Sequence, residues 1–336
     1  MTEWNKDLEK RILKNSRFTL TFRIIRILLL VFLIFAGYKI TANIIADKLN
    51  VGKENAYFSK LALEWTIPNV RGDAELKEES ISLFGTKRLS YNLIKMVGHD
   101  DIVIGKATVT KRLLNSQSHI TYSLPGRESI NEFSFSFPED PRTEKKLEAN
   151  TWPNVWETLE KLPEGTVGEM AFSTTSFMES SQLIDSLKKY NIDILWMPLY
   201  TGEFVDYDPS GWSGDDNIIM VSEIIGLTGG KEHDENYYES MLINRLDEKS
   251  VIESEKLMLK NMEELLKKSE SYYEQFLGLG NLEQKYQYLN EEGFIVYGAV
   301  VTGPTKELLK LKDVSFIQGE QLGEVELWNW QLENLE

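Results

Sequence analysis

The stretch Ile27–Tyr38 reads ILLLVFLIFAGY and decides the architecture, because none of its twelve residues is charged. As a helix, it covers only about 18 Å of a hydrocarbon core that is roughly 30 Å thick. Extension on both sides to about 24 residues gives about 36 Å. Arg23, Arg26 and Lys39 then lie toward the ends, where long side chains reach the lipid headgroups. We predict one transmembrane helix over residues 23–45.

Basic residues gather on the N-terminal side of this helix. The residues that precede its apolar centre are Lys6, Lys10, Arg11, Lys14, Arg17, Arg23 and Arg26, and only Lys39 and Lys48 follow closely. The positive-inside rule then predicts that residues 1–22 form a cytoplasmic stub and that the C-terminal part is extracytoplasmic. A cleaved signal peptide is disfavoured, because Ala42–Ala46 lacks small residues at the required spacing. A buried helix of a soluble protein is disfavoured, because Leu28–Phe35 is apolar on every face.

The composition excludes several classes of protein. The chain has 336 residues, is 42% hydrophobic and 27% charged, and so has room for about two globular domains. The absence of cysteine excludes disulfides, thiolate metal sites and a cysteine nucleophile. Residues 1–48 carry a net charge of +5, whereas residues 49–336 carry −21. The larger part is therefore expected to repel nucleic acid and anionic lipid.

Beyond the span we expect an α+β protein in two parts. Residues 50–145 contain short β-type runs at 81–84, 89–97, 102–110 and 119–124, separated by Gly, Asp and Asn. Asn131–Phe137 alternates with period two, which is typical of a half-buried strand with its phenylalanines in the core. The charged, proline-containing Pro138–Lys146 is the best candidate for a linker.

Residues 150–336 show a strand–helix–strand pattern twice. The first unit has strands at 167–173 and 192–200 around a helix at 180–190, and the second has strands at 294–302 and 315–330 around a short helix that Gly303 and Pro304 open. Two such halves suggest a ferredoxin-like split βαβ domain. The intervening residues 201–290 form an insertion, helical from about Tyr237, whose Leu and Met stripe on Val251–Lys268 is expected to dock on the core.

We find no enzyme signature. His99, His119 and His233 lie far apart in the sequence, and no nucleophile elbow, metalloprotease or phosphate-loop motif occurs. Asp206–Asn217 (DYDPSGWSGDDN) partly resembles a calcium-binding loop but has Asn217 where a bidentate glutamate is needed, which favours a solvated acidic turn. We predict no catalytic residues, no metal and no cofactor. An envelope hydrolase using the acidic residues at 206–216 is the least favoured alternative.

The stub carries a possible contact surface. Trp4, Leu8 and Ile12 recur every four residues among basic side chains, which predicts an amphipathic helix. Such a helix either docks on a cytoplasmic partner or lies on anionic lipid ahead of the span. Both interpretations stay open at the level of the sequence.

Two C-terminal runs carry a family resemblance. Val296–Leu308 (VYGAVVTGPTKEL) and Val325–Trp330 (VELWNW) resemble the signature of the sigma factor regulator family, and Leu162–Val167, Ile194–Trp196 and, more weakly, Ile67–Asn69 and Leu83–Gly85 extend the resemblance. The residues that match this signature include Gly303, Pro304, Thr305, Trp328 and Trp330. These five also have a structural interpretation as a helix start and as sheet packing.

The resemblance implies a membrane-anchored anti-sigma factor of Firmicute type, with one span and an extracytoplasmic regulatory region. Such a protein holds an extracytoplasmic-function sigma factor inactive at the membrane. Because only about 22 residues precede the span here, contact with sigma is expected either directly or through a small membrane partner protein. A membrane-tethered envelope-binding or scaffold protein without sigma contact is the alternative.

Overall fold

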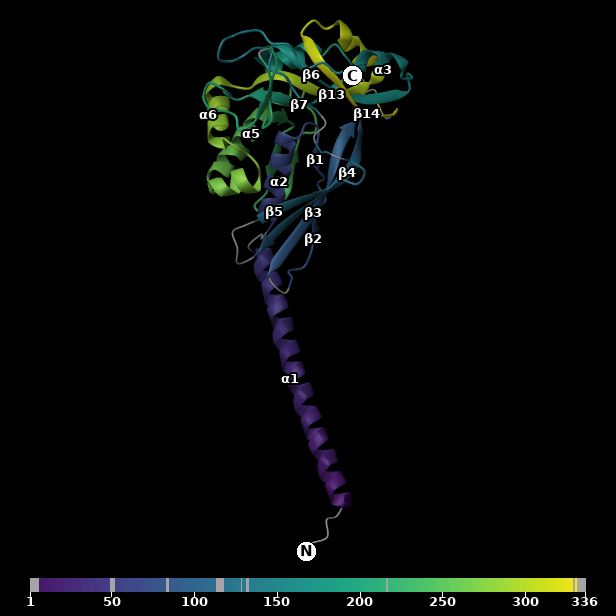
Figure 1. Ribbon diagram of the computed structural model, residues 1–336, viewed down its shortest axis with the longest axis vertical. Coiled ribbons are helices and arrows are strands. Elements are labelled where there is room, and N and C mark those ends of the chain that lie inside the picture. Colours follow the sequence, from purple (N-terminus) through teal and green to yellow (C-terminus); the bar gives the residue numbers. More distant parts are fainter. Residues whose placement is uncertain are drawn as a thin grey trace.

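The computed structural model describes residues 6–48, 52–82, 85–112, 118–127, 129–130, 133–215, 217–328 and 330. One long helix, α1, projects from a folded part that contains all the other described elements (Figure 1). Helix and sheet are mixed in this folded part, with the β-rich region nearer to α1, which confirms the predicted α+β class.

Helix α1 (Lys6–Lys48) has 43 residues and a length of about 64 Å. Its part Glu9–Ile45 is long and apolar enough to cross a membrane, by length and composition, and none of its most apolar window is buried within the protein. The large side chains from Ile24 to Ile34 are at least half exposed. The predicted long apolar helix is therefore present, and its most apolar part lies outside the protein core.

The β-rich region begins with a helix that the sequence did not lead us to expect. Helix α2 (Lys53–Thr66) packs on an antiparallel sheet in the order β1-β3-β4-β5, in which β2 also pairs with β3. The strands are β1 (Arg71–Gly72), β2 (Lys77–Glu78), β3 (Thr86–Val97), β4 (Asp100–Arg112) and β5 (Ser118–Ser123). Strands β3 to β5 confirm three of the four predicted runs. The predicted strand at 81–84 is absent over Ile81 and Ser82, where a turn leads into β3, and Leu83 and Phe84 lie outside the described residues.

The phenylalanine segment is not a strand over its described residues, 133–137, and this prediction is wrong in that respect. Phe133, Phe135 and Phe137 are buried as expected. Side chains take the place of a strand ladder: the Ser136 N–H donates to Ser173 Oγ (2.9 Å), and the Ser134 N–H donates to Gln321 Oε1 (3.1 Å). Period-two burial therefore reflects an extended chain that lies against a sheet without joining it.

The second sheet is antiparallel and has the order β10-β7-β13-β6-β14. Its strands are β6 (Thr166–Glu179), β7 (Asp193–Tyr200), β10 (Gly226–Thr228), β13 (Ile295–Pro304) and β14 (Ile317–Leu327). Helix α4 (Ser180–Leu187) connects β6 to β7, and α7 (Thr305–Leu309) with η2 (Lys310–Asp313) connects β13 to β14. In each unit the two strands are parallel and an antiparallel strand separates them. Each unit is therefore a split βαβ unit, and the ferredoxin-like fold stays a prediction.

The insertion after β7 is less helical than predicted. Short strands β8 (Trp212–Gly214), β9 (Ile219–Val221), β11 (Lys231–His233) and β12 (Glu239–Leu242) precede the helices α5 (Val251–Leu266), η1 (Ser271–Phe276) and α6 (Leu282–Glu292). Helix therefore begins at Val251 and not near Tyr237, because β12 pairs with β11. Leu257, Met262 and Leu265 are buried, which confirms that the stripe on α5 docks.

Each face of the second sheet has its own core. Side chains such as Phe172, Met197 and Val301 face the helices α2 to α6, whereas Ala171, Trp196 and Val300 face the phenylalanine segment. Helix α3 (Val155–Lys161) joins the helical face near α7. Helix α2 contributes to this core with Phe58 and Leu61 and to the core of the first sheet with Leu63. It therefore lies between the two sheets.

Candidate functional site

Two of the three predicted partner-binding residues, Leu8 and Ile12, lie at the free end of α1. Trp4 lies outside the described residues, and Leu8 lies in α1 with no described side chain. Ile12 is 60% exposed. The structure confirms a helix over Leu8 and Ile12. The role of Trp4, Leu8 and Ile12 as a contact surface stays a prediction.

The same part of α1 carries a second, basic face. At 100° per residue, Lys10, Lys14 and Arg17 fall within an arc of about 60°, and Ile12 lies on the other side of the helix. The three basic side chains are exposed and, with Leu13 and Phe18, line a shallow groove along the helix. A helix with one apolar and one basic face can bind an acidic, partly apolar surface.

At its other end α1 is tied to the first sheet. Lys39 Nζ donates a hydrogen bond to the carbonyl of Ile81, and the Ile81 N–H donates to Asn43 Oδ1 over 3.1 Å. Ala42 is buried on this side of the helix, and Ile81 is fully buried. These contacts fix the last turns of α1 against the turn that leads into β3.

Helix α2 follows, and 11 of its 14 residues are buried. Two of these are charged, and both find partners in the β11–β12 hairpin: Glu64 Oε1 lies 2.6 Å from Lys231 Nζ, and Lys60 Nζ lies 2.8 Å from Glu239 Oε1. Lys231 and Glu239 are themselves 3.5 Å apart, so the four side chains form one network. The N–H of Gly72 in β1 also donates to Glu64. We call these four residues the α2 ion network.

The charges of the network perturb one another. Burial raises the pKa of Glu64, against the attraction of Lys231. Burial also acts to raise the pKa of Glu239, but the ammonium groups of Lys231 and Lys60 prevail and lower it. A buried ion of this kind is costly unless it is paired, so each member depends on the others.

A second buried pair joins the two sheets directly. Lys95 of β3 lies 2.9 Å from Glu169 of β6, and both side chains are almost completely buried. Asn69 donates to the same carboxylate over 2.7 Å. The turn between β3 and β4 reaches the second sheet as well, because the Gly98 N–H donates to Thr302 Oγ1 over 2.7 Å.

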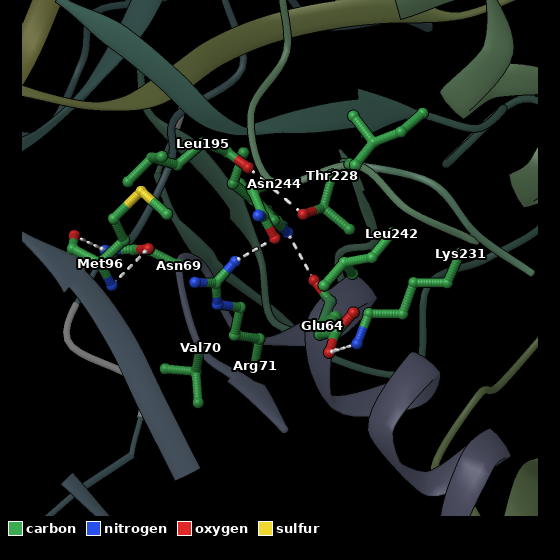
Figure 2. Close-up of a pocket in the computed structure, with 13 residues that line it drawn as sticks. Glu64, Asn69, Val70, Arg71, Met96, Leu195, Thr228, Lys231, Leu242 and Asn244 are labelled. Atoms are coloured by element: carbon green, nitrogen blue, oxygen red, sulfur yellow. Dashed lines mark hydrogen bonds and ion pairs between the residues drawn. The ribbon is translucent and has the colours of Figure 1, made fainter. Parts of the chain in front are cut away.

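Figure 2 shows a small space at the junction of the two sheets, next to Glu64 and Lys231 of the α2 ion network. It is a cavity of about 20 Å³, lined from both sheets by side chains that include Glu64, Arg71 and Lys231. Arg71 donates to Asn244 across it over 2.8 Å. This volume holds about one water molecule, so the cavity is part of a packed junction and not a ligand pocket.

Four of the five signature residues pack inside the second sheet or next to it. Gly303 pairs with Gly168, and a Cβ on it would lie 2.9 Å from Ile192 Cγ2. Pro304 caps α7, and Thr305 is buried with its Oγ1 2.8 Å from Thr166 Oγ1. These contacts agree with a structural interpretation of the motif.

The tryptophans of the signature differ from each other. Trp330 is buried, packs with Val97 and Val167 between the two sheets, and stacks on the ring of His99. Trp328 is half exposed. The signature thus includes one residue of the junction and one on the surface.

No group of three or more His, Cys, Asp or Glu that could hold a metal ion occurs among the described residues. In the acidic loop, the Asp206 N–H donates to the carbonyl of Gly202, and Asp215 Oδ1 accepts the N–H of Asn217 over 2.8 Å. Asp216 lies outside the described residues. Hydrogen bonds between residues so close in the sequence are typical of a turn.

The α2 ion network and the pair of Lys95 with Glu169 were not predicted. Glu64 and Lys231 are 167 positions apart, and no spacing rule connects them. One signal was present. Lys60 and Glu64 are four positions apart and share one helix face, and Leu61 and Leu63 lie on either side of it, so the helix has no fully polar face.

Comparison with known proteins gives two matching family descriptions. Residues 10–102 match "Sigma factor regulator N-terminal", and residues 159–324 match "Sigma factor regulator C-terminal". The first match covers most of α1, all of α2 and the strands β1 to β3, and the second covers most of the C-terminal part.

The chain is also similar to a protein described as probable anti-sigma-M factor YhdL, from Bacillus subtilis (strain 168). The two are 25% identical over 289 residues, which is 84% of this chain and 72% of the relative. No solved structure matches the chain.

Proposed function

The chain belongs to the sigma factor regulator family, and from this premise we propose that it is a single-pass membrane anti-sigma factor. It holds an extracytoplasmic-function sigma factor inactive at the membrane. The observation that carries the proposal is α1, one continuous helix that starts with basic residues, continues as a candidate span and ends tied to the first sheet.

The orientation follows from charge. Basic residues concentrate before the apolar part of α1, which favours a cytoplasmic N-terminus and an extracytoplasmic C-terminal part. The acidic folded part then faces outward and senses envelope conditions, while the stub meets the partner inside.

The stub is short but offers two faces. Residues 6–22 form about 25 Å of helix, which covers one side of a protein domain without enclosing it. The face with Ile12 and the face with Lys10 and Lys14 suit a sigma factor, either alone or together with a small membrane partner protein. No catalytic step is part of the proposal, and the family description is that of a regulator.

The experiment is capture of partners from mildly solubilised membranes through a tag at the C-terminus. We expect the full chain to retain a sigma factor and a chain without residues 2–14 to lose it. A sharper pair is Trp4→Ala with Leu8→Ala, against Val103→Ala with Ile252→Ala, two exposed apolar side chains of the folded part, as the matched control.

Three outcomes separate the alternatives. Loss of the sigma factor with the first pair and retention with the control supports direct contact through the stub. A small membrane protein that bridges to sigma supports a two-part anti-sigma complex. Absence of sigma from every sample, in cells that express it, overturns the proposal in favour of a membrane-tethered scaffold.

A further inference from the structure

A second, larger cavity lies where α2 ends. It has a volume of about 250 Å³, far more than one water molecule needs and just below the usual range for small-ligand pockets. Its walls come from three parts of the chain: Leu63 and Ile67 from the end of α2, Tyr122 from β5, and Ile225, Leu279 and Lys285 from the C-terminal part. The lining combines aliphatic side chains with the polar residues Thr66, Ser222, Glu223 and Lys285.

Lys285 is the unusual member of the lining. It belongs to α6, its side chain is 3% exposed, and its Nζ donates to the carbonyl of Glu223 over 2.9 Å. Among the described residues this is its only recorded acceptor, so two of the three ammonium protons have none. Burial lowers the pKa of Lys285, while the negative charges of Glu203 and Glu223 act in the opposite sense. An ammonium group buried without a full set of acceptors is costly, and an anion in the cavity would remove that cost.

Two carboxylates lie near Lys285, and one of them, Glu223, is part of the cavity lining. Each accepts hydrogen bonds from a residue other than Lys285. Glu203 accepts hydrogen bonds from the N–H and the hydroxyl of Thr201, at 2.7 and 2.8 Å. Glu223 accepts one from the hydroxyl of Ser210. Neither forms an ion pair with Lys285 among the described residues.

We propose that this cavity binds a small soluble carboxylate with a short apolar portion, whose carboxylate pairs with Lys285 and whose apolar part lies against Leu63, Ile67 and Ile225. The position of the cavity favours a soluble ligand over a membrane lipid. Helix α2 extends away from α1 and has 14 residues, so its far end lies about 20 Å beyond the end of α1 (Figure 1). An acyl chain held in the bilayer does not reach this distance.

The site is also placed to influence the membrane helix. Leu63 and Ile67 belong to or directly follow α2, the helix that comes after α1 in the chain and carries half of the α2 ion network. A ligand that favours one position of α2 biases α1 through that connection. This regulatory role rests on the proposed anti-sigma function, whereas ligand binding does not.

The test uses the full chain in lipid nanodiscs, with sodium hexanoate as the probe and sodium chloride to keep the ionic strength constant. Hexan-1-ol and inorganic phosphate separate the apolar from the anionic contribution, and empty nanodiscs correct for partition into lipid. The unfolding midpoint, followed by tryptophan fluorescence, reports binding because a ligand of the folded state raises it.

Two variants make the test specific. Lys285→Met removes the charge and keeps the volume, with the exposed Lys256→Met on α5 as its matched control. Ser222→Trp places a large side chain at an exposed lining position and removes no buried one. If Lys285→Met does not fold, Ser222→Trp decides.

We expect hexanoate to bind at least about ten times more tightly than hexan-1-ol or phosphate, and Lys285→Met and Ser222→Trp each to weaken it at least about tenfold. Equal effects of hexanoate and hexan-1-ol, or unchanged binding by Lys285→Met or by Ser222→Trp, overturn the proposal. Sigma capture needs no hexanoate, so failure of this site and failure of the proposed function are distinguishable.

Discussion

The charged residues on α2 decide in which position this helix joins the two parts of the folded region. Lys60 and Glu64 stand in the interior of a helix that is otherwise packed with apolar side chains, and both are matched by opposite charges from one hairpin. A paired buried ion contributes little net stability, but an unpaired one costs several kcal/mol. The network therefore selects one docking position of α2 more than it adds to stability.

Removal of one partner should show this asymmetry. We expect Lys231→Met to destabilise the protein by about 3–5 kcal/mol, because Glu64 then stays buried without its ammonium partner. The double variant Glu64→Leu with Lys231→Met should recover most of this loss. Urea unfolding of the purified chain, followed by tryptophan fluorescence, measures both. Lys260→Met, which breaks the exposed pair with Glu232, is the control and should change little. A single variant as stable as the control would contradict this account.

Glu239 predicts a specific dependence of stability on pH. Its pKa is lowered in the folded protein, so it contributes stability above its unfolded pKa, and that contribution is lost as pH falls through the folded pKa. Glu239→Gln should therefore be less stable than the wild type at neutral pH, and the difference should shrink between about pH 5 and pH 3. Glu64 has a raised pKa and acts in the opposite sense. The negative charge of Glu239 contributes to that rise, so Glu239→Gln also reduces the Glu64 effect and makes the difference at neutral pH smaller. Thermal unfolding at a series of pH values measures the difference, with the exposed Glu263→Gln as control. A difference that stays constant with pH would show that folding does not lower the pKa of Glu239.

At the scale of elements, α2 is shared between two cores. Phe58 packs in the core of the second sheet and Leu63 in that of the first, on the same helix. We expect Phe58→Ala and Leu63→Ala each to shift one common unfolding transition. The free energy of unfolding should fall by about 3–5 kcal/mol for Phe58→Ala and by about 2–5 kcal/mol for Leu63→Ala. Coincident tryptophan fluorescence and far-ultraviolet circular dichroism in urea test this. Two separate transitions, with Leu63→Ala shifting only one, would show that the sheets fold independently.

The elements that the sequence predicted well are those whose signal is local. The apolar run at 27–38, the short β-type runs in β3 and β4 and the stripe on α5 all predict helix or strand directly. Helix α2 was missed because burial on nearly all faces removes the helical period. The segment at 133–137 was taken for a strand because an extended chain and a strand bury alternate residues alike. The junction could not be predicted from the sequence, because its contacts connect residues about 70–200 positions apart, such as Lys60 with Glu239.

At the scale of the whole molecule, the proposed function requires that the two ends of α1 lie in different compartments. The sequence has no cysteine, so a single introduced cysteine reports its own location. Ser16 lies exposed in the stub and Ser213 lies exposed on β8. With a maleimide that does not cross membranes, we expect Ser213→Cys to be labelled in intact cells stripped of their wall, and Ser16→Cys only after the membrane is permeabilised.

The reverse pattern, or labelling of both positions in intact cells, would contradict the orientation that the basic residues of α1 predict. Reversal of that charge bias provides the matched test, because Lys10→Glu, Lys14→Glu and Arg17→Glu together change the sign of the stub without touching the apolar part of α1. This variant should lower the labelling of Ser213→Cys and, where the orientation is kept, should still lose its partner, because an acidic stub repels an acidic surface. Retention of sigma by correctly oriented protein would place the contact on the face with Ile12 alone.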